Sequence, residues 1–491
     1  MCRVKEEKKE DETITEESRK LADQEAKLNI VLFHIAKHAS SASPHPELRT
    51  IHSALQAGDK LSGKILSGGW TNYSYKIYLE SQPDCRLFAK VCFAYALWDP
   101  SEESTYYDLD RQTTEFQLME HFSGKLNNAK VVATPYLLLD VSDDLRIIVT
   151  EWASAEEQWA NQFIDGHVDR RLLPSIAETM ASIHLTTPEE LPKNLNQGMK
   201  EGLGTMISAF DKDVANHYEN ADMSADACLS LLAELGQDRV FAITEAMNLA
   251  AKTDQSILGH ADLHVFNILV ESKPDDNELE VFGPKGIFCI CDWEMAHWCP
   301  KGRDIGLLYC FPIAAAYFHA TQGHVRQAND MIDCLREHWD VYSLAMTKNG
   351  NKSQAYLREA FRSVLGFCGM FLFLIFYTKG GLVDMIHKDG LSDEDVSTIM
   401  GLLGKTGLHF LEWSFMDDVD EASLDLEGLR KLFQASIEQD MATLVSSRAA
   451  KRPSIRRSSL LRKQGRRVSD ASLLSMQSIQ ATLELDEDFQ M

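Results

Sequence analysis

The chain has 491 residues, 44% of them hydrophobic, so it is long enough to bury one or two sizeable cores. Its formal net charge of −25 excludes a general nucleic-acid-binding surface. Ten cysteines without a repeated Cys-x-x-Cys pattern, and a charged first stretch in place of a signal peptide, predict a cytoplasmic protein.

Charge and hydrophobicity divide the chain into four regions. Residues 1–45 are a charged arm in which a helix starts at Ala26, residues 50–153 are rich in predicted strands, residues 154–445 are helical, and residues 446–491 form a basic, Ser/Arg-rich, disordered tail. The longest apolar run, residues 364–377, is shorter than the roughly 20 residues that a bilayer requires. We therefore expect it to be a central helix of the helical region, and we expect no stable membrane insertion.

The strand-rich region carries a pattern typical of phosphate binding. Gly68 and Gly69 precede an alternating strand that begins near Asn72, and glycine lets backbone amides approach phosphate groups. Lys90 has apolar neighbours in the next strand, where an unpaired ammonium is costly to bury. We expect it to pair with Glu115 on the following helix and to hold the α- and β-phosphates. A Gly-Gly hairpin turn and a solvent-exposed lysine are the alternative interpretations.

Residues 260–294 carry the strongest chemical pattern. Asp262 and Asn267 are separated by four residues, which is the spacing of the catalytic Asp and the metal-binding Asn in kinase catalytic loops. Two apolar strands follow, separated by a turn-rich segment, and the second ends at Asp292. Hard oxygen ligands in this order predict a magnesium-dependent phosphoryl-transfer centre. A chance motif, with Asp292 as a turn cap, is the alternative.

Over most of residues 50–445 the chain resembles the aminoglycoside phosphotransferase and choline/ethanolamine kinase superfamily. The resemblance rests on Gly-Gly-x-Thr-Asn at 68–72, the lysine strand at 86–91, the helix at 172–184, the loop at 260–267 and Asp-Trp-Glu at 292–294. Residues 300–306 are most similar to methylthioribose kinases, but no paired arginines follow Gly369 as they do there. Ala261 stands where the superfamily usually has Gly, and Arg303 where an aromatic residue is common.

The resemblance implies an α+β, two-lobed, protein-kinase-like fold with a small antiparallel N-lobe at 50–153 and a larger helical C-lobe at 154–445. It implies ATP and Mg²⁺ as cofactors and a small-molecule hydroxyl acceptor, such as an amino alcohol, a sugar or an aminoglycoside-like compound. Asp262 would be the general base, Asn267 and Asp292 the Mg²⁺ ligands, and Glu294 a further ligand through water.

It also implies supporting roles for other residues. Gly68, Gly69 and Asn72 would cover the phosphates, and Lys90 would bind them with Glu115 as its anchor. The strand that ends at Glu151 resembles the hinge whose backbone meets adenine. Asp304 would brace the catalytic loop, and His260 and His264 would be structural hydrogen-bonding residues.

Two other functions compete with this one. A catalytically silent kinase-like protein that binds nucleotide or a partner would not need Asp262, Asn267, Asp292 and Lys90 together. A protein kinase is disfavoured because no Ala-Pro-Glu segment follows Asp292. One cluster of cysteines and a histidine also has a zinc site as an alternative interpretation: Cys289, Cys291, His297, Cys299 and Cys310. An apolar strand and a following helix explain these residues better.

The tail differs in charge from the rest of the chain. Residues 448–467 contain nine Lys or Arg residues and no acidic residue. Ser459 and Ser469 each follow a pair of arginines, which is typical of sites for a basophilic regulatory protein kinase. A disordered solubilising end, a nuclear import signal and a contact with an anionic membrane are the alternatives.

Overall fold

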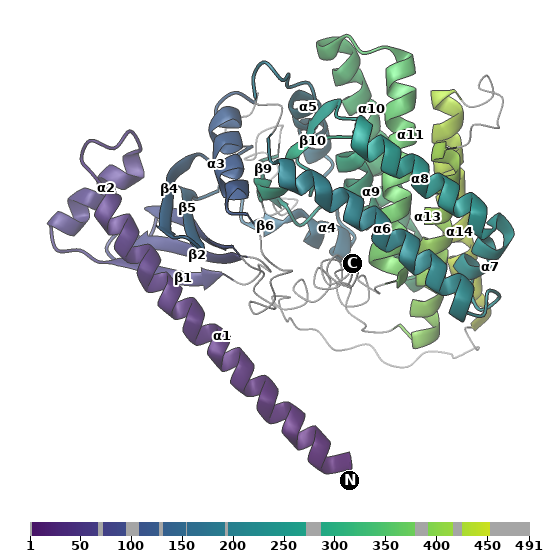
Figure 1. Ribbon diagram of the computed structural model, residues 1–491, viewed down its shortest axis with the longest axis horizontal. Helices are drawn as coiled ribbons and strands as arrows, with labels where there is room; N and C mark the ends of the chain where they lie inside the picture. The colour runs from purple at the N-terminus through teal and green to yellow at the C-terminus, as the bar shows by residue number, and fades with distance from the viewer. Residues whose placement is uncertain are drawn as a thin grey trace, which may run out of the picture. The chain divides into compact units, whose positions relative to one another are not determined.

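The computed structural model describes residues 2–66, 72–94, 108–126, 131–153, 155–191, 195–271, 286–378, 391–415 and 425–451 (Figure 1). It divides the chain into two compact units. The first comprises residues 1–123 and 133–153, and the second comprises residues 124–132 and 154–491. Gly68, Gly69, Ser459 and Ser469 lie outside the described residues.

The first unit begins with a long helix, α1 (Cys2–His38). The predicted helix start at Ala26 is wrong, because residues 2–25 contain neither Gly nor Pro and are rich in the helix formers Glu and Lys. The C-terminal part of α1 is attached to the rest of the unit, since Val31 and Ile35 are fully buried and Tyr75 Oη donates a hydrogen bond of 2.9 Å to the carbonyl of Gln24.

A five-stranded antiparallel sheet forms the centre of this unit, in the order β1-β2-β3-β5-β4. Its strands are β1 (Leu61–Leu66), β2 (Asn72–Leu79), β3 (Arg86–Phe93), β4 (Pro135–Ser142) and β5 (Leu145–Glu151), and its helices besides α1 are α2 (Pro46–Gln56) and α3 (Asp110–Phe122). Alternate residues of β3, among them Ala89 and Val91, belong to the hydrophobic core that α1 and α2 complete. Because side chains alternate between the faces of a strand, Lys90 lies on the face opposite this core.

The second unit is mainly helical. Its helices are α4 (Trp159–Asp165), α5 (Leu172–His184), α6 (Gln197–Asn220), α7 (Ala227–Leu235), α8 (Gln237–Thr253), α9 (Arg303–Gln322), α10 (Val325–Gly350), α11 (Gln354–Phe371) with a π-helical extension at Leu372–Thr378, α13 (Asp393–Phe415) and α14 (Leu426–Lys451). Every residue of α9 from Arg303 to Thr321 is buried, so this helix is the centre of the unit. A Cβ atom at Gly306 would lie 2.8 Å from the backbone nitrogen of Cys368, so glycine allows α9 to approach α11 closely.

Two small sheets flank the loop that carries the kinase-like motif. In one, β7 (Ile257–Gly259) pairs with β10 (His297–Cys299). In the other, β8 (Ile268–Val270) lies between β6 (Glu157–Gln158) and β9 (Phe288–Ile290). The predicted strand pair is confirmed, since β8 and β9 are antiparallel with Ile268 opposite Ile290. The loop at 260–267 therefore begins in one sheet and ends in the other.

The predicted α+β fold, with an antiparallel sheet in the first unit and a larger helical second unit, is confirmed. The predicted tail boundary at 446 is wrong for its first residues, since α14 extends to Lys451, through Ser and Ala residues that do not interrupt a helix. One stretch, Gln354–Thr378, is long and apolar enough to span a membrane, but 83% of its most apolar window is buried inside the fold. It is the core helix that the sequence predicted.

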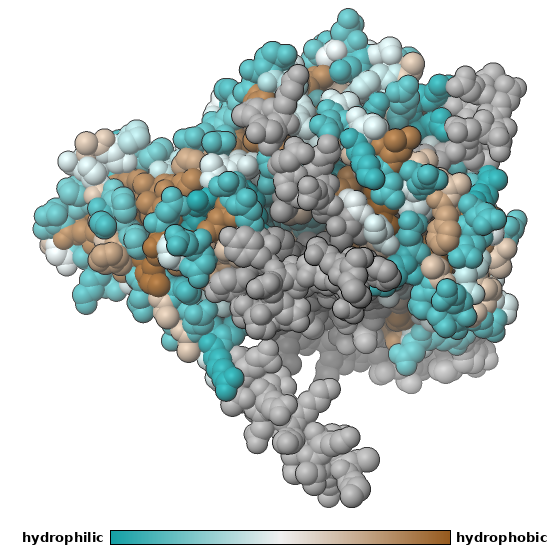
Figure 2. All heavy atoms as spheres, viewed as in Figure 1, coloured by the Kyte–Doolittle hydropathy of each residue, from teal (hydrophilic) through white to brown (hydrophobic). Residues whose placement is uncertain are grey.

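The described surface carries few large hydrophobic side chains. On the face shown in Figure 2, hydrophilic residues cover most of the described part of the second unit. The exposed large hydrophobic residues are distributed over three helices, α1, α8 and α10: Leu21, Phe33, Leu249, Val325 and Leu344. This distribution indicates single exposed side chains rather than a docking surface.

Candidate active site

The loop at 260–267 is held by one buried carboxylate, that of Asp304 in the first turn of α9. Asp304 Oδ2 accepts a hydrogen bond of 2.7 Å from the backbone nitrogen of His260, and its Oδ1 accepts one of 2.8 Å from that of Ala261. Ala261 has φ 67°, a left-handed conformation that costs a non-glycine residue about 1–2 kcal/mol. The expected brace is therefore present, and it supports the strained residue at which the superfamily usually has Gly.

A second layer of hydrogen bonds orients Asp304. His184 Nε2 lies 3.1 Å from Asp304 Oδ2, and His184 Nδ1 lies 2.9 Å from the hydroxyl of Tyr342. Burial by itself would raise the pKa of Asp304, but the hydrogen bond from His184, the interactions with the two imidazoles and the hydrogen bond from the backbone of His260 outweigh it and lower the pKa to about 2. Asp304 is therefore ionised at neutral pH and acts as a fixed hydrogen-bond acceptor.

Asp262 and Asn267 lie together, as their spacing predicts. Asn267 Nδ2 is 2.9 Å from the backbone carbonyl of Asp262 and 3.3 Å from its Oδ2. The side chain of Asp262 is 29% exposed, and no described residue hydrogen-bonds its Oδ1. One carboxylate oxygen is thus held by the loop, and the other remains available to a ligand.

The two histidines of the loop behave differently. His260 Nε2 lies 2.9 Å from the backbone carbonyl of Cys291, and the ring packs against Trp293 with centroids 4.7 Å apart. Burial lowers the pKa of His260, so the neutral ring donates to that carbonyl and ties the loop to the end of β9. Its predicted structural role is confirmed.

The same prediction for His264 is wrong. His264 is buried, yet among the described residues neither ring nitrogen has a hydrogen-bond partner. Its Nε2 lies 3.6 Å from Asp262 Oδ2, and its ring forms an edge-type pair with Phe266, with centroids 5.8 Å apart. Packing against Phe266 fixes the ring next to the carboxylate of Asp262, a placement that residue spacing alone does not reveal.

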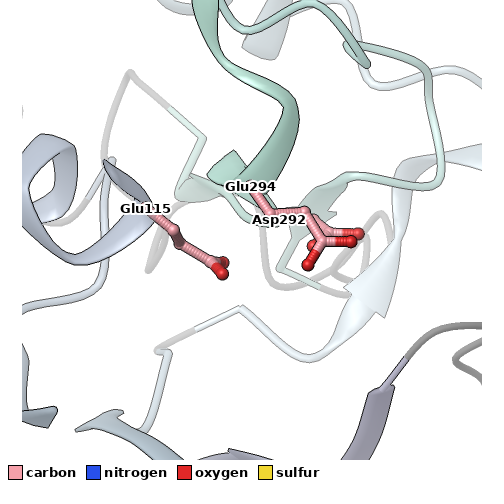
Figure 3. Close-up of side chains that lie close together, drawn as sticks. All are labelled: Glu115, Asp292 and Glu294. Carbon is pink, nitrogen blue, oxygen red and sulfur yellow. The ribbon is translucent and has the colours of Figure 1, made fainter. Parts of the chain in front are cut away.

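Asp292 follows β9 and precedes the 3₁₀ turn Trp293–Met295, and Glu294 lies within that turn (Figure 3). Asp292 adopts φ 67°, which Asp tolerates better than most residues, and oxygens of the two carboxylates lie within 4.8 Å of each other. Trp293 Nε1 donates to the carbonyl of Ile290 at 3.1 Å, and Asn196 Nδ2 donates to the carbonyl of Glu294 at 2.6 Å. Asn196 was not predicted, because no motif connects it with residues almost 100 positions away.

In the first unit the predicted ion pair is present. Lys90 Nζ lies 3.2 Å and 3.0 Å from the two carboxylate oxygens of Glu115, and both side chains are buried. Asn72, the first residue of β2, is buried opposite Cys92 of β3. Figure 3 also labels Glu115, on α3 of this unit. The roles of these residues in phosphate binding stay predictions.

Glu151 ends β5 and is held by its neighbours. Its Oε1 accepts hydrogen bonds of 2.9 Å from both the backbone nitrogen and the hydroxyl of Thr134. Two cations lie over the ring of Trp152, with Lys76 Nζ at 4.6 Å and Arg86 Cζ at 5.6 Å from its centroid. The end of the strand is therefore rigid, and its predicted contact with adenine stays a prediction.

The residues considered for zinc do not form a site. His297 Nδ1 lies 2.8 Å from the carbonyl of Met295, and its Nε2 lies 3.0 Å from Arg303 Nη1. Within the described ranges, Cys289, Cys299 and Cys310 are buried and join no group of three metal-ligating side chains. They pack in the core, as expected for residues of an apolar strand and the helix that follows it.

The sequence model of a family described as "Phosphotransferase enzyme family" matches residues 62–344. No curated protein sequence matches the chain.

Several solved structures are distantly similar. A thermostable mutant of aminoglycoside phosphotransferase APH(4)-Ia, in complex with ADP and hygromycin B, is 10% identical, with 77% of this chain and 100% of that chain covered and a TM-score of 0.34. Aminoglycoside 2'-phosphotransferase-IIIa with GDP is 14% identical, with 83% and 99% covered and a TM-score of 0.28. Glucosamine kinase with glucosamine, ADP and inorganic phosphate is 10% identical, with 79% and 93% covered and a TM-score of 0.30.

Proposed function

The chain belongs to the phosphotransferase enzyme family, and we propose that it transfers the γ-phosphoryl group of ATP to a hydroxyl group of a small molecule in a magnesium-dependent reaction. The observation that carries the proposal is the carboxylate of Asp262. Its Oδ2 is approached by Asn267 Nδ2 at 3.3 Å and by His264 Nε2 at 3.6 Å, while no described residue hydrogen-bonds its Oδ1. A general base needs this arrangement, in which one oxygen is fixed and the other is accessible.

In the proposed reaction, Asp262 Oδ1 accepts the hydrogen bond and then the proton of the acceptor hydroxyl. The hydroxyl oxygen forms a bond to the γ-phosphorus, the bond between that phosphorus and the β,γ-bridging oxygen breaks, and its electron pair leaves with ADP. Asp262 then releases the proton to water. His264 and Asn267 orient the carboxylate throughout, which is the main contribution a protein makes to this reaction.

The side chains of the second unit fit a magnesium ion. Asn267 Nδ2 donates to Asp262, so the amide oxygen of Asn267 is the atom left to ligate a cation. Asp292 and Glu294 add carboxylate oxygens within 4.8 Å of each other. Carboxylate and amide oxygens are the ligands that Mg²⁺ prefers, and the bound ion would neutralise charge on the phosphate oxygens. We assign Asn267 and Asp292 as direct ligands and Glu294 as a ligand through water.

The first unit would bind the nucleotide. The buried ion pair with Glu115 fixes the ammonium of Lys90, and we assign Lys90 to the α- and β-phosphates of ATP. We assign Gly68, Gly69 and Asn72 to the turn that covers the phosphates, and the backbone around Glu151 to adenine. An amino alcohol, a sugar or an aminoglycoside-like compound is the proposed acceptor, and the cytoplasm is the proposed location.

The proposal is tested by ATP turnover against a panel of amino alcohols, sugars and aminoglycosides. With an acceptor in hand, Asp262→Asn should lower kcat by about 10²–10⁴-fold and leave ATP affinity similar, because the base acts in the transition state. Asp84→Asn, at an exposed position, is the matched control. Turnover by the Asp262 variant at the wild-type rate would refute its role as base. Tight Mg-ATP binding with no turnover of any acceptor would favour the catalytically silent alternative.

A further inference from the structure

Three histidines gather at a second place in the helical unit, where two helices end. Gly166 (φ 76°) ends α4 and is followed by His167, and Gly323 (φ 79°) ends α9 and is followed by His324. The third, His319, lies in the last turn of α9. A Cβ atom at Gly166 would lie 3.1 Å from His319 Cε1, so the left-handed glycine brings the two helix ends into close contact.

The tautomer of His319 follows from its surroundings. His319 is 4% exposed, and its Nε2 lies 2.9 Å from the backbone carbonyl of Phe163. A carbonyl oxygen can only accept, so Nε2 carries a hydrogen and donates it to this carbonyl. With its hydrogen on Nε2, the neutral ring presents a lone pair at Nδ1.

That lone pair faces another histidine. His319 Nδ1 and His324 Nδ1 are 3.5 Å apart, with the ring planes inclined by 37°. This separation is longer than the ordinary range of roughly 2.7–3.2 Å for hydrogen bonds from N–H groups. It matches two imidazole nitrogens on one tetrahedral zinc ion, which bonds of about 2.0–2.1 Å would place about 3.4 Å apart.

The surroundings of His319 are those of a metal ligand. Metal-bound histidines usually donate their second ring N–H to a carbonyl or a carboxylate, and His319 donates to Phe163. His324 is exposed, so an ion can enter from solvent. His167 is also exposed, and it directly follows Gly166, whose Cβ position lies 3.1 Å from His319 Cε1, so its backbone lies next to the pair.

From this geometry we propose that His319 and His324 bind a borderline-soft divalent cation of the zinc class, with His167 turning in as a third ligand and water completing the coordination. The nitrogen ligands separate this site from the oxygen ligands at Asp292 and Glu294, which suit Mg²⁺. The bound ion would link the end of α4 to the α9–α10 turn. At its other end α4 contacts the catalytic loop, where the backbone nitrogen of Ala160 donates to the carbonyl of Val265 at 3.2 Å.

The test is a zinc titration of the full-length protein by calorimetry, without nucleotide and with excess Mg²⁺ to occupy the carboxylate site. All variants carry His34→Ala and His38→Ala, because these two side chains are four residues apart on α1 and can bind zinc as a pair. In this background we expect one zinc ion per chain. His324→Ala should weaken its binding at least tenfold, His167→Ala should weaken it less, and His324→Cys should keep it.

A visible spectrum after loading with Co²⁺ gives a second readout, since a tetrahedral nitrogen site has intense absorption bands that His324→Ala should abolish. His324 is exposed, so its replacement is not expected to unfold the protein, and far-UV circular dichroism checks this. Equal zinc affinity for the background and its His324→Ala variant would overturn the proposal, as would the absence of zinc binding in the background. Neither result depends on catalytic turnover, so the outcome is independent of the proposed function.

Discussion

Replacing Asp304 by Asn is the sharpest test of how the catalytic loop is held. The change preserves size but removes the charge and one acceptor oxygen. Asp304 accepts three hydrogen bonds, from the backbone nitrogens of His260 and Ala261 and from His184 Nε2. The amide group of Asn would turn its NH₂ toward at least one of these donors. Hydrogen bonds to charged groups contribute about 1.5–3 kcal/mol each, so we expect the free energy of unfolding to fall by about 3–5 kcal/mol.

The loop strain supplies a second, independent prediction. Asp304 holds the peptide nitrogen of Ala261, whose left-handed conformation Gly adopts without strain. Ala261→Gly should therefore stabilise the wild type by about 1 kcal/mol and the Asp304→Asn variant by less, because the loop can relax its strain once the brace is weakened. Urea unfolding of the four proteins, with kcat measured in parallel, completes the double-mutant cycle.

The matched control is Glu219→Gln, an acid-to-amide change at an exposed position of α6. It should leave the midpoint of unfolding unchanged. Two results together would refute the reasoning: an unfolding free energy of Asp304→Asn within about 0.5 kcal/mol of wild type, and a coupling energy near zero. Asp304 would then be a buried acid whose hydrogen bonds do not hold the loop.

Four further predictions follow from the contacts described above. Lys90→Met removes the ammonium from the buried carboxylate of Glu115, so urea unfolding should show a loss of about 3–5 kcal/mol, and a loss below about 1 kcal/mol would contradict a buried pair. The folded pKa of Asp304, about 2, lies below its ordinary value of 3.8. Ionised Asp304 therefore contributes about 2 kcal/mol to the free energy of unfolding above about pH 4, and this contribution is lost as the pH falls from about 4 to 2. Asp304→Asn should flatten this part of the acid unfolding curve. His264→Asn should lower kcat while leaving the KM for ATP and the thermal midpoint near wild type, because the imidazole contacts Asp262 and lacks hydrogen bonds to lose, and an unchanged kcat would exclude a positioning role. We hypothesise that the basic tail makes a salt-sensitive contact with the acidic remainder of the chain and that phosphorylation at Ser459 or Ser469 releases it. Removing residues 448–491 should then change activity more at low salt than at high salt, and identical kinetics at both salt concentrations would leave the tail inert.

Local patterns in the sequence determined much of the site. The spacing of Asp262 and Asn267 predicted their proximity, because five steps along a tight loop leave the two side chains within reach of each other. The apolar segments around the turn predicted the β8–β9 pair, since an antiparallel hairpin needs only neighbouring strands and a turn. The charge of Lys90 among apolar neighbours predicted an acidic partner, and Glu115 was chosen because it lies on the predicted helix that follows.

The helix boundaries were less well determined. Charged residues at the start of the chain suggested a solvated arm, but a charged segment without Gly or Pro is also a good helix, and α1 begins at Cys2. For the same reason the tail was predicted to start at residue 446, whereas α14 extends to Lys451. Charged residues are typical both of a solvated, irregular segment and of an exposed helix, so composition alone could not distinguish these two structures.

Only the tertiary structure decided which polar groups meet. His184 and Asp304 are 120 residues apart, and no sequence spacing connects them. The ring of His264 packs against Phe266 and has no hydrogen-bond partner within the described residues, and His319 meets His324 where a left-handed glycine ends α9 between them. A sequence specifies which side chains can donate, accept or ligate, whereas close packing of the helices decides which of them are brought within hydrogen-bond or ligand distance.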